Sequence, residues 1–307
     1  MTPRLLDCAA SDFASMTRPD LLEAITAAEG RTLICETSAL TEPLIAGITN
    51  AEVAASLAAD MILLNFLDVD DPVINGLPGD TPIADSVRTL KRLAGRPVGI
   101  NLEPIDARYE PDPADPYFVP PGRRATQANA LRAAELGVDL IVFTGNPGAG
   151  VSNHTIADAV AEAHEVVGDR LVLAAGRMHA AGVFGPQGGL LTLAEVDAFI
   201  DAGADIVLLP APGTVPGVTL ELVHPLVSRV HSRGALVMTT IGTSQEGSDE
   251  ATMRQFALTA KMAGADLHHI GDAGYSGIAT PENIFAYSIA VRGRRHTIAR
   301  MARSVLR

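Results

Sequence analysis

The sequence predicts a single (β/α)8 barrel with an extra N-terminal helix and a long loop after its third strand. Eight short apolar runs alternate with eight helical patterns from residue 30 to the end of the 307-residue chain. The runs lack polar alternation, as expected for parallel strands that are covered by helices. The units also repeat in pairs, and such quarter repeats favour a closed eightfold barrel over two doubly wound domains.

Each predicted strand leads into a predicted helix. We place the strands at residues 31–36, 60–65, 97–103, 139–144, 170–175, 205–210, 235–240 and 265–270. The helices that follow them fall at about 49–58, 83–94, 124–136, 153–167, 192–202, 218–233, 249–263 and 281–303, and an extra helix at about 19–29 precedes the first strand. We expect one domain over 1–307, with residues 1–29 as an N-terminal segment and 30–307 as the eight βα units.

The starts of the even-numbered strands carry the repeat. They read AAD (58–60), GVD (137–139), GAD (203–205) and GAD (264–266), whereas the odd-numbered strands follow a glycine directly or after one residue. Helices commonly end on a glycine in the left-handed conformation, so each glycine marks a helix end just before a strand.

Composition excludes several classes of function. The formal net charge is −13, which argues against nucleic acid and anionic membranes as partners. Two cysteines are too few for a disulfide scaffold. The N-terminus lacks a signal-peptide pattern, and no apolar run is long enough to span a bilayer, so we expect a cytoplasmic protein. The stretch 291–307 carries six arginines and no acid, which suits a helix end or an acidic neighbouring subunit.

Lysine is rare enough to constrain the chemistry. Only Lys91 and Lys261 occur among 23 basic residues, and both fall in predicted helices. A Schiff-base aldolase needs a lysine inside the barrel, so this reaction and pyridoxal phosphate chemistry are disfavoured. No dinucleotide or P-loop motif occurs in the right setting, so no nicotinamide or flavin cofactor is expected.

Active sites of such barrels lie at the carboxyl ends of the strands. In the third strand, Asn101 and Glu103 share the face opposite an apolar set, so Glu103 should point into the barrel mouth. We expect Glu103 as general base, His179 as its acid partner or electrophile, Glu36 as an orienting group and Arg177 as a holder of negative charge. In the alternative interpretation, Glu36 and Glu103 only pair with arginines at the barrel rim.

Glycine-rich loops suggest an anion site. The loops after strands 7 and 8 often bind phosphate in these barrels. Together with two asparagines of earlier loops, they provide the predicted substrate- and phosphate-binding residues: Asn101, Asn146, Ser244, Gly271, Asp272, Gly274, Ser276 and Gly277. The alternative is that the glycines only form tight turns. The proline-rich stretch 106–122 is interpreted as an active-site loop or lid.

A divalent metal, Mg, Mn or Zn, is a further candidate. Glu36, Glu103 and His269 offer mixed oxygen and nitrogen ligands. Adjacent His268 and His269 point to opposite faces of their strand, so at most one faces the barrel.

An apolar strand followed by Asp68-Val-Asp70 resembles the nucleophile motif of haloacid dehalogenases, but Pro72 departs from that motif. A more extensive resemblance rests on GRPVGINLEP (95–104), TGNPGAGVSN (144–153), GRMHAAG (176–182), GADIVLLPAPGTVPGVTLE (203–221), TTIGTSQEGSDEAT (239–252) and HHIGDAGYSGIATPENIFAYSIAVRGRRHT (268–297). These blocks resemble an uncharacterised bacterial TIM-barrel family whose members are often labelled haloacid dehalogenase-like or phosphoenolpyruvate phosphonomutase-like. The resemblance implies the barrel fold and a sugar-metabolism context, and it implies no catalytic residues.

The sequence therefore predicts an enzyme that acts on a small phosphorylated or anionic, sugar-derived metabolite by acid–base chemistry, as a lyase or isomerase. A metal-dependent hydrolase and a non-catalytic ligand-binding barrel remain alternatives. We expect a small-molecule substrate as partner and a homo-oligomeric assembly.

Overall fold

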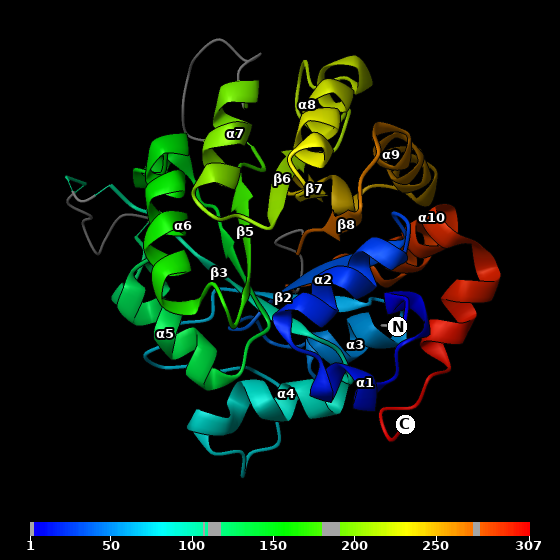
Figure 1. The fold of residues 1–307 in the computed structure, drawn as a ribbon. Helices are drawn as coiled ribbons and strands as arrows, with labels where there is room; N and C mark the ends of the chain where they lie inside the picture. Colours follow the sequence, from blue (N-terminus) through cyan, green and yellow to red (C-terminus); the bar gives the residue numbers. More distant parts are fainter. Residues whose placement is uncertain (1–2, 107, 110–117, 180–190, 273–276) are drawn as a thin grey trace.

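The predicted (β/α)8 barrel is confirmed. The computed structural model describes residues 3–106, 108–109, 118–179, 191–272 and 277–307. Eight parallel strands follow one another around a closed barrel, in which β8 pairs with β1 (Figure 1). Helices surround the strands on the outside of this barrel. Every predicted strand is present, with bounds within a few residues of those expected.

The strands are β1 (Thr32–Ser38), β2 (Met61–Asn65), β3 (Val98–Leu102), β4 (Leu140–Phe143), β5 (Val172–Gly176), β6 (Ile206–Pro210), β7 (Leu236–Ile241) and β8 (Leu267–Ile270). The helices that follow them are α3 (Asn50–Ser56), α4 (Ser86–Ala94), α5 (Gln127–Leu136), α6 (Asn153–Val167), α7 (Leu193–Asp201), α8 (Leu220–Ser232), α9 (Glu250–Ala263) and α10 (Pro281–Met301). Two helices precede β1, the expected α2 (Arg18–Ala27) and the shorter α1 (Ala10–Ser15), which was not predicted.

The repeated aspartate before each even-numbered strand has a structural role. Each aspartate bonds one residue of the preceding odd-numbered strand twice. The aspartate carboxylate accepts a hydrogen bond from the main-chain N–H of that residue, and the aspartate N–H donates to its carbonyl. The four pairs are Asp60 with Leu33, Asp139 with Val98, Asp205 with Leu173 and Asp266 with Val237, with carboxylate bonds of 2.8, 2.9, 3.0 and 2.8 Å. The sequence repeat thus reflects four equivalent links between neighbouring strands at the amino ends of the barrel.

The helix ends follow the expected glycine pattern at most positions. Gly95, Gly137 and Gly264 end α4, α5 and α9 in the left-handed conformation. Ala58 occupies the equivalent position before β2 with φ of +80°, although an alanine adopts this conformation at a cost. Gly168, at the end of α6, differs from expectation because its φ of −64° is in the right-handed helical region. Three residues separate Gly168 from β5, whereas two separate Gly95 from β3.

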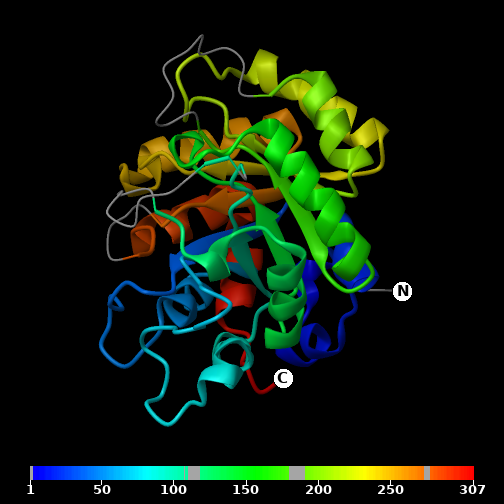
Figure 2. The same ribbon diagram turned by 90° about the vertical axis from the view of Figure 1, so that its left-hand side faces the viewer.

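The N-terminal segment closes the amino end of the barrel. Leu5, Phe13, Leu21 and Ile25 belong to the same buried cluster as the inward-facing side chains of the strands, such as Ile34. The C-terminal end of the chain lies beside this segment, where Ser11 N donates to Arg307 O (2.8 Å) (Figure 2). The helices pack their apolar faces against the outward-facing strand residues in a second cluster. No helix among the described residues is long and apolar enough to cross a membrane.

The arginine-rich C-terminal stretch is partly buried, in contrast to the surface roles expected for it. Arg292 and Arg300 of α10 both contact the carboxylate of Asp60, and all three side chains are fully buried. Arg300 also donates to main-chain carbonyls of Leu5 and Cys8. These two arginines therefore fasten α10 to the amino end of the barrel.

Candidate active site

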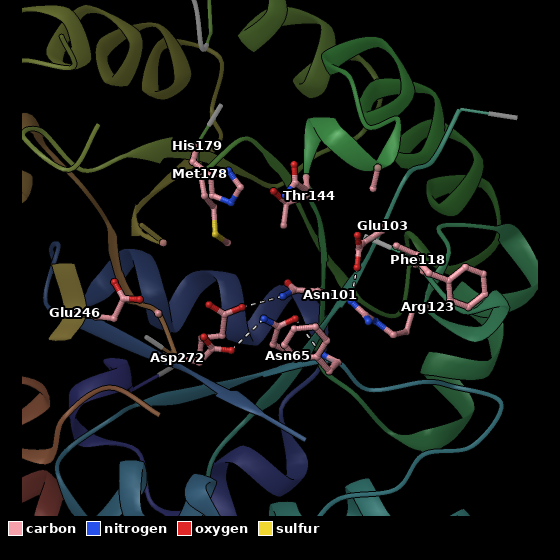
Figure 3. A pocket seen from close by; sticks show the side chains of 18 residues that line it. Asn65, Asn101, Glu103, Phe118, Arg123, Thr144, Met178, His179, Glu246 and Asp272 are labelled. Carbon is pink, nitrogen blue, oxygen red and sulfur yellow. Dashed lines mark hydrogen bonds and ion pairs between the residues drawn. The ribbon is translucent and has the colours of Figure 1, made fainter. Parts of the chain in front are cut away.

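A cavity of about 310 Å³ opens at the carboxyl ends of the strands. Such a volume suits a small metabolite. Figure 3 shows the polar side chains that point into it from several βα loops. The lining comprises Glu36, Asn65, Phe66, Asn101, Glu103, Phe118, Val119, Arg123, Thr144, Gly145, Asn146, Ala149, Met178, His179, Gly242, Glu246, Gly271 and Asp272.

Glu36 lies at the centre of a buried polar group. Its Oε1 accepts a hydrogen bond of 3.0 Å from Asn101 Nδ2, and its Oε2 lies 3.1 Å from His269 Nε2. His268 faces the other way, where its ring nitrogens contact Tyr287 and the carbonyl of Gly30. His269 is therefore the histidine of this pair that faces the barrel interior, and it is fully buried.

Glu103 faces the cavity from the end of β3, as the strand alternation predicts. Its carboxylate forms an ion pair with Arg123, and its main-chain N–H donates to Arg123 O (2.8 Å). The guanidinium of Arg123 lies over the Phe66 ring, 4.6 Å from its centre. Burial raises the pKa of Glu103, and the charge of Arg123 opposes that rise. The alternative in which both glutamates only pair with arginines therefore agrees with the Glu103–Arg123 ion pair. It does not describe Glu36, which pairs with His269.

His179 and Arg177 occupy different places, although their spacing suggested one shared face. His179 lines the cavity, and burial together with the charge of Arg177 lowers its pKa. Arg177 is not among the lining residues, and its charge interacts with Glu195 of α7. Both residues lie beyond Gly176, the last residue of β5, so the alternation of the strand does not decide where their side chains point. The expected role of Arg177 in holding the negative charge of a substrate therefore stays a prediction.

The loop after β8 contributes only part of its predicted anion site to the cavity. Gly271 and Asp272 line it, and Asp272 Oδ2 accepts a hydrogen bond of 3.2 Å from Asn65. A side chain at position 271 would come within 2.6 Å of Ile241 O, so the close contact with β7 requires glycine. Gly277 instead packs against the loop after β1, where its carbonyl accepts from Ser38 N (2.8 Å).

The remaining predicted binding residues are spread around the site. Asn146 lines the cavity, and its side chain accepts a hydrogen bond from Gly148 N (2.8 Å). Ser244 is not a lining residue; it begins a short 3-10 turn in the left-handed conformation. Gly274 and Ser276 lie outside the described residues. The predicted loop 106–122 borders the cavity through Phe118 and Val119.

Four polar residues of the cavity, Asn65, Arg123, Thr144 and Glu246, were not predicted as site residues. Arg123 lies 20 residues beyond Glu103, past the long loop, and no local pattern links the two. Asn65 is the last residue of β2, and strand-end position alone could have singled it out. Glu246 lies in the loop after β7, where the sequence showed a polar run without indicating which side chain turns inward.

The predicted metal ligands do not come together. Glu36 and His269 are adjacent, but Glu103 is engaged with Arg123. Among the residues that the structure describes, no three histidine, cysteine, aspartate or glutamate side chains form a group that could hold a metal ion. The side chains present therefore do not fit the expected site. Both lysines also lie away from the lining, Lys91 against Asp139 and Lys261 against the carbonyl of Val291.

Comparison with known proteins places the chain in a family without an assigned activity. The model of a domain of unknown function, DUF7916, matches residues 6–307. No protein of curated function matches the chain.

The fold is shared with solved structures at low sequence identity. One is a provisionally assigned lyase/mutase from Burkholderia cenocepacia J2315, with 17% identity, coverage of 84% of this chain and 83% of that chain, and a TM-score of 0.51. Another is 2,3-dimethylmalate lyase, a PEP mutase/isocitrate lyase superfamily member, with 14% identity, coverage of 83% and 80%, and a TM-score of 0.50. At these identities the likeness shows the fold alone. The closed barrel gives no support to the haloacid dehalogenase-like label.

Proposed function

We propose that this chain, which belongs to the DUF7916 family, is a lyase- or isomerase-type enzyme that moves a proton at a carbon next to a carbonyl group. One observation carries the proposal. Glu103 and His179 line the same cavity, and burial raises the pKa of the acid while it lowers the pKa of the imidazole. The rise makes the carboxylate a stronger base, and the fall keeps the imidazole neutral, so that it can donate a hydrogen bond to a substrate.

Glu103 is the general base of this proposal. Its burial makes the carboxylate a stronger base than an exposed glutamate, while Arg123 stabilises the ionised form that accepts a proton. His179, with its lowered pKa, is neutral at neutral pH and can donate a hydrogen bond to the substrate carbonyl oxygen. Glu36 is a positioning residue, because both its oxygens are engaged by Asn101 and His269.

The substrate is a small, hydroxyl-rich anionic metabolite, which a sugar derivative would satisfy. Amide and hydroxyl groups of Asn65, Asn101, Asn146 and Thr144 line the cavity and suit the hydroxyls of such a molecule. Arg123 is the only lysine or arginine among the described lining residues, so it is the group to which we assign the anionic end.

Hydrogen–deuterium exchange at carbon tests this proposal without knowledge of the product. The full chain is incubated in deuterated water with pyruvate, dihydroxyacetone phosphate or fructose 6-phosphate, and loss of the C–H signal is followed by proton NMR. We expect exchange with at least one compound and a slowing by about 10²–10⁴ in Glu103→Gln. Both proteins should melt at nearly the same temperature.

Glu250→Gln serves as the matched control, because Glu250 is half-exposed on α9 and pairs with Arg254. This variant should exchange like the unaltered protein. Exchange that persists in Glu103→Gln would remove Glu103 from the role of base. Absence of exchange in the unaltered protein with every compound would count against the proposed reaction.

A further inference from the structure

Glu246 is a cavity carboxyl with no role in the proposal above. It lies after β7 in the short turn Gln245–Gly247, and only 3% of it is exposed. Asn283, at the start of α10, donates from its buried side chain to the carbonyls of Glu246 (2.8 Å) and Ser248 (2.6 Å). The main chain on both sides of the carboxyl is therefore fixed by a different element of the fold.

The loop is also anchored on its other side. Gln245 Nε2 donates to Thr214 O (3.0 Å), and Thr243 Oγ1 donates to the same carbonyl (2.9 Å). Ser244 adopts the left-handed conformation with φ of +75°, an uncommon conformation for a residue other than glycine. Such anchoring holds the Glu246 side chain toward the cavity instead of leaving it on a free loop.

The surroundings of Glu246 disfavour its ionised form. Its Oε2 has no hydrogen-bond partner among the described residues, although the atom is buried. The charged groups that face it are Glu36 from β1, Asp272 after β8 and His269 from β8. Burial has the largest effect and raises the pKa of Glu246, and the carboxylates of Glu36 and Asp272 raise it further. A hydrogen bond from the main-chain N–H of Glu246 itself and the charge of His269 oppose the rise. An ionised carboxylate in this place would have a main-chain N–H as donor but none at the buried Oε2, and buried charges require more complete pairing.

We infer that Glu246 is the general acid of the site, a protonated carboxyl group that faces the substrate from the side of the cavity opposite Glu103. Figure 3 shows the two glutamates on opposite sides, with His179 and Met178 on one flank and Asn65 and Asp272 on the other. This inference rests on the proposed function. Glu246 is the proton donor for the carbonyl oxygen when Glu103 converts a carbonyl compound into an enol.

The step balances with the two glutamates alone. Glu103 takes the proton from the carbon next to the carbonyl, and the electron pair of that C–H bond forms the new C=C bond. The π electrons of the carbonyl group move to its oxygen, which takes the proton of Glu246. The enol is then neutral, Glu103 is protonated and Glu246 is ionised; the reverse transfers restore both groups. The imidazole of His269 is the nearby group that can stabilise the Glu246 carboxylate.

Infrared difference spectroscopy tests the protonation state without any substrate. A protonated carboxylic acid has a C=O stretch that is well separated from the bands of carboxylates. We expect the neutral-pH spectrum of the full chain to contain one such band that Glu246→Gln removes, while Glu250→Gln leaves it in place. Loss of carboxylate intensity instead of the acid band in Glu246→Gln would show an ionised side chain and overturn the inference.

The deuterium exchange assay tests the acid role itself. Glu246→Gln should slow exchange by about 10²–10⁴. Glu246→Asp, which keeps the acid but shortens the side chain, should keep the infrared band and still lose rate; it also serves if the glutamine variant fails to fold. Normal exchange in a folded Glu246→Gln together with loss in Glu103→Gln would overturn the inference and leave the proposed function intact. No exchange by the unaltered protein overturns the proposed function and the acid role with it.

Discussion

Arg123 controls how readily Glu103 gives up its proton. Burial raises the pKa of Glu103, and the guanidinium of Arg123 is the nearby charge that lowers it. In Arg123→Gln the opposing charge is absent, so the pKa of Glu103 should rise further. Because the base acts in its ionised form, the acidic limb of the exchange rate against pH should move to higher pH. The measurement is the pH profile of deuterium exchange for the unaltered protein and the variant.

Arg132→Gln is the control for this prediction. Arg132 is half-exposed on α5 and pairs with Asp70, and neither residue lines the cavity. Its replacement should leave the pH profile unchanged. An acidic limb that stays in place in Arg123→Gln, with overall activity retained, would mean that another group is the base.

The direction of an individual side chain was predictable from the sequence where strand geometry alone decides it. Alternation along β3 predicted the cavity positions of Asn101 and Glu103. Alternation does not decide the directions of Arg177 and His179, because both lie beyond the end of β5 at Gly176. Arg123 could not be predicted, since its contact with Glu103 spans a long loop whose path no local pattern specifies.

At the level of elements, the aspartates before the even-numbered strands explain both a sequence repeat and the attachment of helices. Each links two strands, and each also meets a basic side chain from a helix: Arg292 and Arg300 of α10 at Asp60, Lys91 of α4 at Asp139, Arg18 of α2 at Asp205 and His231 of α8 at Asp266. The strand starts were therefore predictable from the repeat, whereas the basic partners come from unrelated helices and carry no common motif.

Asp60 should contribute most to stability among these links, because it and both its arginines are fully buried. Asp60→Asn leaves two buried guanidinium groups without a carboxylate, and breaking a buried ion pair in this way costs about 3–5 kcal/mol. Urea denaturation should show this loss in the free energy of unfolding. Asp139→Asn should cost less, since Lys91 and Asp139 are partly exposed. A cost of Asp60→Asn no larger than that of Asp139→Asn would contradict this ranking.

At the scale of the whole molecule, the amino end of the barrel contributes to stability and the carboxyl end contains the candidate active site. The amino end holds the aspartate links, the buried arginines and the N-terminal segment that closes it. The carboxyl end holds the cavity and its partly unsatisfied polar groups. This division is common in (β/α)8 barrels, whose amino ends serve stability and whose carboxyl ends serve chemistry. The barrel order made the location of the cavity predictable, together with Glu36, Glu103 and Asp272 at the strand ends, but not Glu246, whose direction depends on how the loop after β7 folds.

The division predicts that stability and activity can be lost separately. Glu103→Gln should slow exchange by about 10²–10⁴. It should lower the free energy of unfolding less than Asp60→Asn does, because the Glu103–Arg123 pair is partly exposed whereas the Asp60 cluster is fully buried. Asp60→Asn should lower the free energy of unfolding and keep the exchange rate per folded molecule, because it acts at the opposite end of the barrel. Both quantities are measured on both variants at a temperature where each is folded. A large loss of exchange in folded Asp60→Asn would show instead that the buried ion cluster is coupled to the cavity through the strands.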